Sequence, residues 1–305
     1  MENIIQRLNE FLGGPKGLLS LCIEGMSLKL LACRGERVVA WAITPINPRF
    51  LRGGFAVNSQ GLASVIRAAV SKEEFSGQHR VLASLPAFHS VFRTLEIPNL
   101  KEVRPEVVIP QQARRDMGYS AENTLLFWHP LESGVDRRRF FVVSVPREPV
   151  LTLVETLRLA GLRPDKIETT TFALSRAVNQ SQAIIVAVEP NSLDSIIMRD
   201  NIPLATRSTF LGERPQEPEA LPALVTDALE RIIAFYDESN PDNPLPPDIP
   251  VCLFGSALSL NPDIVPAVES ALGRPVAEFE PPILYPPDFP KAELAVNVGL
   301  VLKEL

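Results

Sequence analysis

The sequence is poor in the residues that build disulfide frameworks and metal sites. Its three cysteines, Cys22, Cys33 and Cys252, are widely separated, and each lies in an apolar stretch. An odd and scattered set of this kind predicts buried thiols in a reducing compartment. The three histidines are equally isolated, without the i, i+4 spacing of ligands on one helix face. We therefore expect neither a disulfide nor a metal site.

The chain also lacks an excess of positive charge and a long apolar run. It has 30 Lys and Arg against 36 Asp and Glu residues, a formal net charge of -6. Nucleic-acid binding needs a basic face, so we expect no nucleic-acid partner. No apolar run reaches the roughly eighteen residues of a membrane span, and the N-terminus lacks the cationic start and cleavage site of a signal peptide. A cytoplasmic protein is the simplest prediction.

Several common catalytic motifs are absent as well. The sequence contains no G-x-x-x-x-G-K-[ST] phosphate loop, no G-x-G-x-x-G dinucleotide turn and no G-x-S-x-G nucleophile elbow. These absences argue against P-loop ATPases, dinucleotide-binding enzymes and α/β-hydrolases. No other cluster of residues suggests catalysis, and we assign no catalytic residue.

What the chain does contain is an internal repeat. The stretch 18–43 reads as three short strands joined by turns at Gly25 and Gly35, where glycine permits unusual backbone angles. The stretch 183–208 repeats this pattern at a constant offset of 165 residues, so that Glu24 corresponds to Glu189. A helix-like segment and a short apolar strand follow each copy. The sequence therefore predicts two copies of one α/β unit.

The two copies suggest a division of the chain. A length of 305 residues and a hydrophobic content of 46% are sufficient for about two packed domains. We expect a first subdomain at 1–78 plus 166–180, an inserted αβ subdomain at 79–165, and a second subdomain at 181–305. The connector 211–222 is too polar and rich in proline to be a core element, so we expect the upper part of the second subdomain to be reduced to 209–250. An amphipathic helix at 1–14 is predicted to dock on the body or on a partner.

Four stretches of the chain together carry a resemblance to one family. They are CIEGMSLKLL, QQARRDMGYSAENTLLFW, LRLAGLRPDKIETTTFALSRAV and LFGSALSLNPDIVPAVESALGRPV. They resemble the PilM branch of the actin-like ATPase superfamily, the type IV pilus assembly proteins related to the cell-division protein FtsA. The resemblance implies an α/β fold of duplicated actin-like (ribonuclease H-like) domains, with an αβ insert in the first half and a reduced second half.

The resemblance also implies a nucleotide site, from which this sequence departs. The family binds ATP between its halves with two Asp-Ile-Gly-Ser phosphate loops, whose aspartates organise Mg²⁺. Here the aspartates are replaced by Cys22 and Ala187, and the glycines by Glu24 and Glu189. Carboxylates at these places would repel a triphosphate. We expect no cofactor, with ATP and Mg²⁺ as the alternative. The vestigial nucleotide-binding residues would be Ser27, Lys29, Gly255 and Ser256.

For partners, the resemblance implies the cytoplasmic N-terminal tail of PilN, a bitopic inner-membrane protein. This chain would then be a cytoplasmic scaffold held at the inner membrane through its partner, alongside other components of the machine. An extended peptide can lie in a groove or along a sheet edge. The candidate tail-binding residues are apolar residues of the insert, which could equally be its core: Met117, Tyr119, Leu126 and Trp128.

Two alternatives to this interpretation stay open. The chain could be a working ATPase that drives pilus assembly, in which Glu24 or Glu189 stands in for a missing aspartate. It could also serve a secretion or competence machine in place of a pilus.

Overall fold

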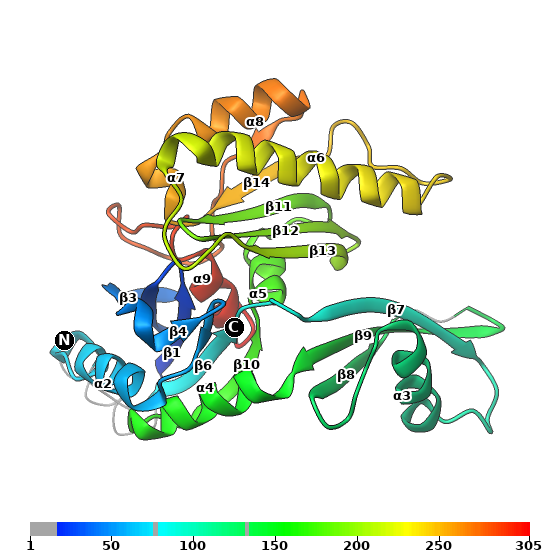
Figure 1. The fold of residues 1–305 in the computed structure, drawn as a ribbon, viewed down its shortest axis with the longest axis horizontal. Coiled ribbons are helices and arrows are strands. Elements are labelled where there is room, and N and C mark those ends of the chain that lie inside the picture. The colour runs from blue at the N-terminus through cyan, green and yellow to red at the C-terminus, as the bar shows by residue number, and fades with distance from the viewer. Residues whose placement is uncertain (1–16, 76–78, 132–133) are drawn as a thin grey trace, which may run out of the picture.

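The computed structural model describes residues 17–75, 79–131 and 134–305, arranged as two lobes and a projecting insert. The second lobe lies above the first in Figure 1, and the insert extends to the right. The helix predicted at 1–14 lies outside the described residues. Within the described part of the chain, no helix is both long and apolar enough to cross a membrane.

The first lobe is built on a five-stranded sheet with the order β10-β6-β1-β2-β3. Helices α2 and α4 pack together and contribute to the core on one face of this sheet. Helix α2 begins directly after Asn58, whose side chain accepts a hydrogen bond from the Gly61 N–H at 2.8 Å. The strands are β1 (Gly17–Glu24), β2 (Ser27–Arg34), β3 (Arg37–Pro45), β6 (His79–Leu85) and β10 (Pro164–Thr169), with the hairpin β4 (Leu51–Arg52) and β5 (Phe55–Ala56). The helices are α2 (Ser59–Val70) and α4 (Arg147–Leu159).

The second lobe repeats this plan with the sheet order β13-β12-β11-β14-β15. Helices α6 and α8 pack together over the sheet, and Gly273 ends α8 in the left-handed conformation that glycine adopts without strain. The strands are β11 (Ala183–Glu189), β12 (Ser192–Arg199), β13 (Ile202–Phe210), β14 (Val251–Phe254) and β15 (Val276–Ala277). The helices are α6 (Leu221–Ser239), α7 (Ala257–Leu260) and α8 (Ile264–Leu272).

The predicted repeat is confirmed down to the register of its strands. In the first copy Leu18 pairs with Cys33, and in the second copy Ala183 pairs with Met198. Both members of the second pair lie 165 residues after their counterparts in the first. The register shift that interrupts β2 and β3 at Cys33 recurs between β12 and β13 at Met198. Two copies that share even an irregularity have the same backbone architecture, although few of their residues match.

The insert is smaller than the predicted range 79–165. It consists of the three-stranded sheet β7-β9-β8 and the helix α3, while β6 and β10 pair in the first main sheet and α4 packs on α2. Strand β6 joins the main sheet because it runs parallel to β1 after the crossover helix α2. The insert elements are β7 (Val91–Pro98), α3 (Pro105–Asp116), β8 (Thr124–Pro130) and β9 (Arg137–Pro146).

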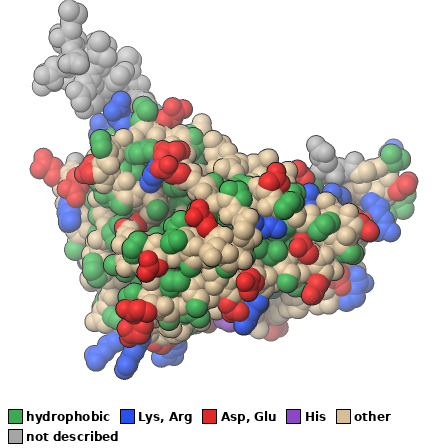
Figure 2. Space-filling view, turned by 90° about the horizontal axis from the view of Figure 1, so that it is seen from above, with side chains coloured by type: hydrophobic (Ala, Val, Ile, Leu, Met, Phe, Trp, Pro, Cys, Tyr) green, Lys and Arg blue, Asp and Glu red, His purple; other side chains and the backbone are tan. Residues whose placement is uncertain are grey.

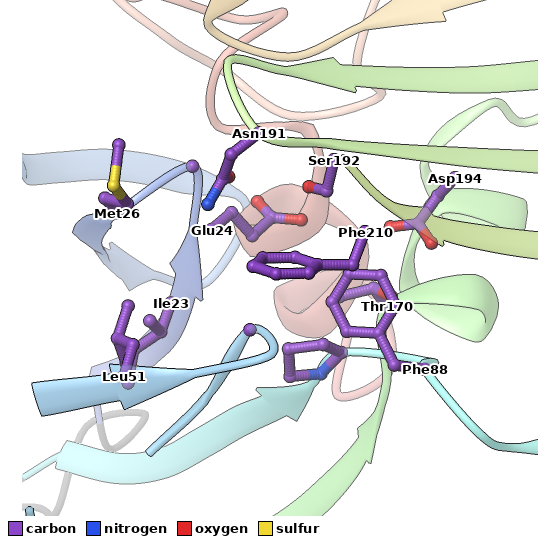
Figure 3. A pocket seen from close by; sticks show the side chains of 13 residues that line it. Ile23, Glu24, Met26, Leu51, Phe88, Thr170, Asn191, Ser192, Asp194 and Phe210 are labelled. Carbon is purple, nitrogen blue, oxygen red and sulfur yellow. The ribbon is translucent and has the colours of Figure 1, made fainter. Parts of the chain in front are cut away.

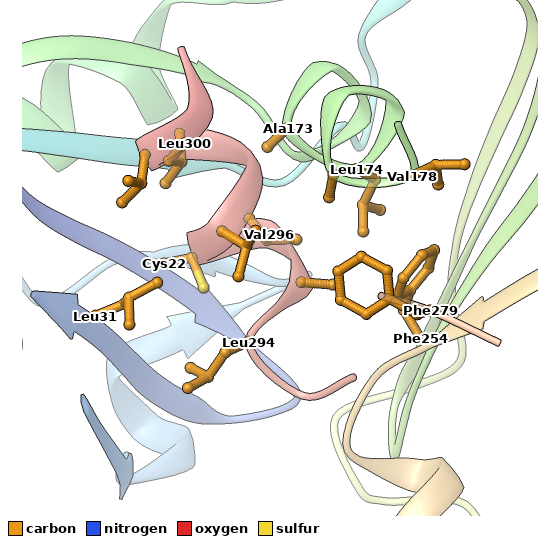
Figure 4. Packing of buried hydrophobic residues seen from close by; sticks show 14 of the residues in the cluster. Cys22, Leu31, Ala173, Leu174, Val178, Phe254, Phe279, Leu294, Val296 and Leu300 are labelled. Carbon is orange, nitrogen blue, oxygen red and sulfur yellow. The ribbon is translucent and has the colours of Figure 1, made fainter. Parts of the chain in front are cut away.

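Two helices join the lobes at the centre of the molecule. Helix α5 (Thr170–Ala177) packs across α9 (Ala295–Leu302), and α9 lies against β1 and β2 of the first lobe although it ends the second half of the chain. The helices approach closely at Gly299, where an added Cβ would lie 1.9 Å from the carbonyl oxygen of Ala173. One apolar core runs from the first sheet through both helices into the second sheet, where Phe254 and Phe279 stack edge to face (Figure 4).

Candidate functional site

Two turns face each other across the cleft between the lobes, and a buried lysine joins them. The first turn follows Glu24 at the end of β1, and the second follows Glu189 at the end of β11. Lys29 on β2 is completely buried, and its Nζ lies 3.3 Å from Glu24 Oε2 and 2.6 Å from Glu189 Oε1. Both carboxylates are almost wholly buried as well. The result is a Glu–Lys–Glu cluster that connects the two lobes.

Further contacts fix the Glu189 carboxylate. Ser256 donates to it from its hydroxyl, at 2.5 Å to Oε2, and from its backbone N–H, at 3.3 Å to Oε1. Gly25 packs so tightly on the carboxylate that an added Cβ would lie 2.2 Å from Glu189 Oε2. Gly255 has a φ of 103° and lies directly against the backbone of Val188.

The structure therefore places the four predicted nucleotide-binding residues around Glu24 and Glu189, where they contact these glutamates or their strands. Lys29 and Ser256 bind the carboxylate of Glu189. Gly255 lets the chain pass close to β11, and Ser27 pairs with Glu24 at the start of β2. The resemblance was sufficient to identify these residues. The contact between Lys29 and Glu189 could not be predicted, because it joins positions 160 residues apart in the chain.

The charges of the cluster depend on one another. Burial raises the pKa of Glu24 to about 7, although Lys29 acts in the opposite direction. Burial also disfavours the ammonium of Lys29, but Glu189 and Glu24 outweigh it and raise the pKa of Lys29 above its ordinary value. Lys29 is therefore charged at neutral pH. At neutral pH Glu24 is close to its midpoint, which moderates the negative charge in the cleft.

A third carboxyl group, Asp194, lies near the cluster on β12. It is buried, and its Oδ1 has no hydrogen-bond partner among the described residues, as is also true of Thr170 Oγ1. Both residues line a cavity of about 20 Å³ between the lobes (Figure 3). The rings of Phe88 and Phe210 line the same cavity, with their centroids 6.0 Å apart. The space is sufficient for one water molecule.

We expect the replacement Asp194→Asn to stabilise the protein at neutral pH. Burial raises the pKa of Asp194 from 3.8 to about 6, so the folded state holds this proton more tightly than the unfolded state. The wild-type free energy of unfolding therefore loses a contribution as the pH rises from about 4 to about 6. The variant lacks this loss, and its advantage should grow over that range to roughly 1–3 kcal/mol.

Urea denaturation of both proteins between pH 4 and pH 8 measures this difference. Asp227→Asn is a matched control, because Asp227 is exposed and pairs with Arg231 on the surface of α6. Its effect should stay within about 0.5 kcal/mol. A variant Asp194→Asn that is less stable than wild type at pH 8 would contradict the prediction.

The cleft does not fit a magnesium-bound triphosphate. Phosphate loops need backbone N–H groups open to the ligand and an aspartate free to organise the metal. Here the two turns are closed by Glu24, Lys29 and Glu189, whose charged groups are directed at one another. Cys22 donates to the side-chain oxygen of Asn297, and burial raises the pKa of its thiol. Within the described residues, no three His, Cys, Asp or Glu side chains gather as metal ligands.

A second and much larger hollow lies beside the insert. It has a volume of about 920 Å³ and opens between one face of the insert sheet, helix α5 and the start of β13. Its lining is mostly apolar, and Arg176, Lys303 and Glu168 form a charged group at its rim. On the surface seen in Figure 2, by contrast, apolar side chains lie scattered among acidic ones. We call this hollow the insert groove.

The insert sheet presents different residues to its two faces. Met117, Tyr119, Leu126 and Trp128, the predicted tail-binding residues, pack together in the insert core with Ile109 of α3. Of the four, only Trp128 also lines the insert groove.

The side chains that face the groove are the alternate residues of β8, which the sequence analysis missed. They are Leu125, Phe127 and His129, and the Phe127 side chain is exposed. Because neighbouring residues of a strand point to opposite faces, an error of one position exchanges the two sets. The alternation was visible in the sequence, but the face covered by α3 was not.

Comparisons with known proteins identify the fold. No protein-family model matches the chain, and no curated protein is similar enough in sequence to match. A solved "PilM-PilN type IV pilus biogenesis complex" has 20% identity and a TM-score of 0.75, over 94% of this chain and 98% of that one. The ethanolamine utilization protein EutJ from Carboxydothermus hydrogenoformans has 13% identity and a TM-score of 0.55, over 94% and 90%.

A third solved structure has the same fold. The cytoplasmic domain of EpsL, an inner-membrane component of the type II secretion system of Vibrio cholerae, has 12% identity and a TM-score of 0.52, over 95% of each chain. The chain therefore has the α/β actin-like ATPase fold that the sequence predicted.

Proposed function

We propose that this chain is a PilM-like scaffold of a type IV pilus or of a related secretion or competence machine. It holds the cytoplasmic N-terminal tail of a PilN-like inner-membrane protein, and through this partner it sits at the inner membrane. The similarity to the solved PilM–PilN complex over nearly the whole chain supports this assignment. The pattern of four matching stretches supports it independently.

The observation that carries the proposal is the insert groove. It has a volume of about 920 Å³, and apolar side chains from three parts of the fold line it: β8, α5 and the start of β13. Leu125 and Phe127 of β8, Phe172 of α5 and Ile202 of β13 all line this space. A peptide with alternating apolar residues would bury them here, while its polar residues stay in water.

We propose further that the scaffold works without ATP hydrolysis. A general requirement of phosphoryl transfer is a set of positive groups free to bind the developing charge of the phosphate. Lys29 already binds Glu24 and Glu189, and neither carboxylate is free to replace the missing aspartates. The alternative of an ATPase that uses one of these glutamates would require the whole cluster to come apart.

The test is a binding titration with a synthetic peptide that covers the cytoplasmic tail of the PilN-like protein of the same organism. We expect wild-type protein to bind it, and Phe127→Asp to weaken the affinity at least tenfold, because the change places a charge in the groove. Phe235→Asp is the matched control. Phe235 is 54% exposed against 57% for Phe127, but it lies on α6 away from the groove.

The same titration with millimolar Mg·ATP tests the second part of the proposal. The peptide affinity should change less than twofold, and the melting temperature should not rise, since a ligand stabilises only a protein that binds it. Absence of peptide binding would overturn the scaffold assignment. Stabilisation by Mg·ATP that is lost in Glu24→Gln would favour the ATPase instead.

A further inference from the structure

Strand β8 lies at the edge of the insert sheet and has one side open. In the order β7-β9-β8, it pairs only with β9 among the described residues. The pairing runs without a register shift from Thr124 to Pro130. The segment 124–128 contains no charged residue, no proline and no bulge, which are the devices that protect exposed edges from pairing, and one proline, Pro130, ends the strand.

The hydrogen-bond register shows which backbone groups face outward. The Leu131 N–H donates to the Arg139 carbonyl, so the odd-numbered residues of β8 are bonded to β9. The even-numbered residues face the open side, as the Thr124 N–H confirms by donating to the Ser120 carbonyl outside the sheet. The backbone N–H and C=O groups of Leu126 and Trp128 are therefore directed at the open edge.

The open edge and the insert groove belong to the same surface. The Trp128 side chain packs in the insert core beside α3, and Trp128 also lines the groove. The side chains of Leu125 and Phe127, whose backbone groups bond to β9, line the groove as well. At the N-terminal end of the edge, the Arg147 guanidinium donates to the Thr124 carbonyl at 3.5 Å. This contact leaves the stretch 126–130 as the accessible part, enough for a peptide strand of about five residues at 3.3 Å each.

We propose that the tail binds by strand addition: it pairs with the open edge of β8 as a fourth strand of the insert sheet. This inference rests on the proposed function. Up to four backbone hydrogen bonds to Leu126 and Trp128 fix the tail, and every second side chain of the tail enters the groove beside Phe127. The residues Leu126 and Trp128 thus contact the partner through their main chain, while their side chains hold α3.

A series of tail peptides, each with one N-methylated backbone amide, tests the inference by fluorescence anisotropy. N-methylation removes a donor and blocks the strand at that position. We expect alternate positions over about five residues to lose at least tenfold in affinity, and the positions between them to lose less than threefold. This period of two arises only if alternate amides of the tail bond to β8.

Amide hydrogen exchange with the unmethylated peptide supplies a second measurement. Exchange at Leu126 and Trp128 should slow at least tenfold on binding. Leu125 and Phe127 are internal controls, because their amides already bond to β9. A peptide that binds without the alternation, and without protection at Leu126 and Trp128, would overturn strand addition and leave the scaffold function standing. Failure of the unmethylated peptide to bind would overturn both.

Discussion

Replacing Lys29 by methionine should lower the free energy of unfolding by about 3–5 kcal/mol, as is usual when one partner of a buried ion pair is removed. Methionine has nearly the volume of the lysine side chain, so the effect comes from charge and not from a cavity. Glu24 and Glu189 are left buried without a cation, in a space that water barely enters. Urea denaturation monitored by circular dichroism measures the loss.

The pH dependence of this loss identifies its cause. Glu24 already has its pKa raised to about 7 by burial, against the influence of Lys29. Without the lysine its pKa rises further, and the proton it takes up relieves the repulsion. The destabilisation should therefore be largest at pH 8 and clearly smaller at pH 5.

A triple variant gives the matched control for Lys29→Met. In Glu24→Gln, Lys29→Met, Glu189→Gln, all three charges disappear together, and no buried ion is left alone. Because no buried charge is then left without a partner, part of the lost stability should return. If Lys29→Met stays within 1 kcal/mol of wild type, the cluster does not hold the lobes in the way described.

The second large effect is expected at the crossing of α5 and α9. Gly299→Ala adds a methyl group that would lie 1.9 Å from the carbonyl oxygen and 2.5 Å from the carbonyl carbon of Ala173. Backbone atoms cannot rotate away, so the two helices must separate within the core that joins the lobes. We expect a loss of about 2–4 kcal/mol despite the better helix propensity of alanine, measured by thermal and urea denaturation.

Gly61→Ala is the control for the crossing. Gly61 also lies within a helix, and its added Cβ would meet the Phe50 ring at 2.6 Å. A side chain at the surface of the lobe can turn aside, so this variant should lose no more than about 1.5 kcal/mol. Equal losses in the two variants would show that the close approach of the backbones is not the cause.

The sequence was sufficient for the architecture because the fold depends on local patterns. The turns at Gly25 and Gly35 and the short apolar strands beside them are each encoded within a few residues. The repeat then relates two such patterns along the chain. The limits of the insert were harder to predict, because the assignment of β6 to the main sheet depends on pairing with β1, about sixty residues earlier in the chain.

The site was predictable only in part. The sequence indicates that Glu24 and Glu189 would repel a phosphate group. It does not reveal that Lys29, which the resemblance assigns to a vestigial nucleotide site, binds both of them. One signal was available: Lys29 stands between Leu28 and Leu30 in an apolar central strand. A lysine buried there requires a carboxylate. The groove residues were missed for another reason, since only the position of α3 decides which face of β8 is covered.

The open edge of β8 also has a consequence for the cell that makes this protein. An open edge strand with the apolar segment Thr-Leu-Leu-Phe-Trp is a template for pairing with another strand, including the same segment of a second copy. An edge that is paired with the tail has no free backbone groups, whereas an unpaired edge can bind a second chain and start aggregation. Under the proposed strand addition, protein made in excess over its partner would self-associate through this edge, so balanced synthesis of the two chains would keep the edge covered.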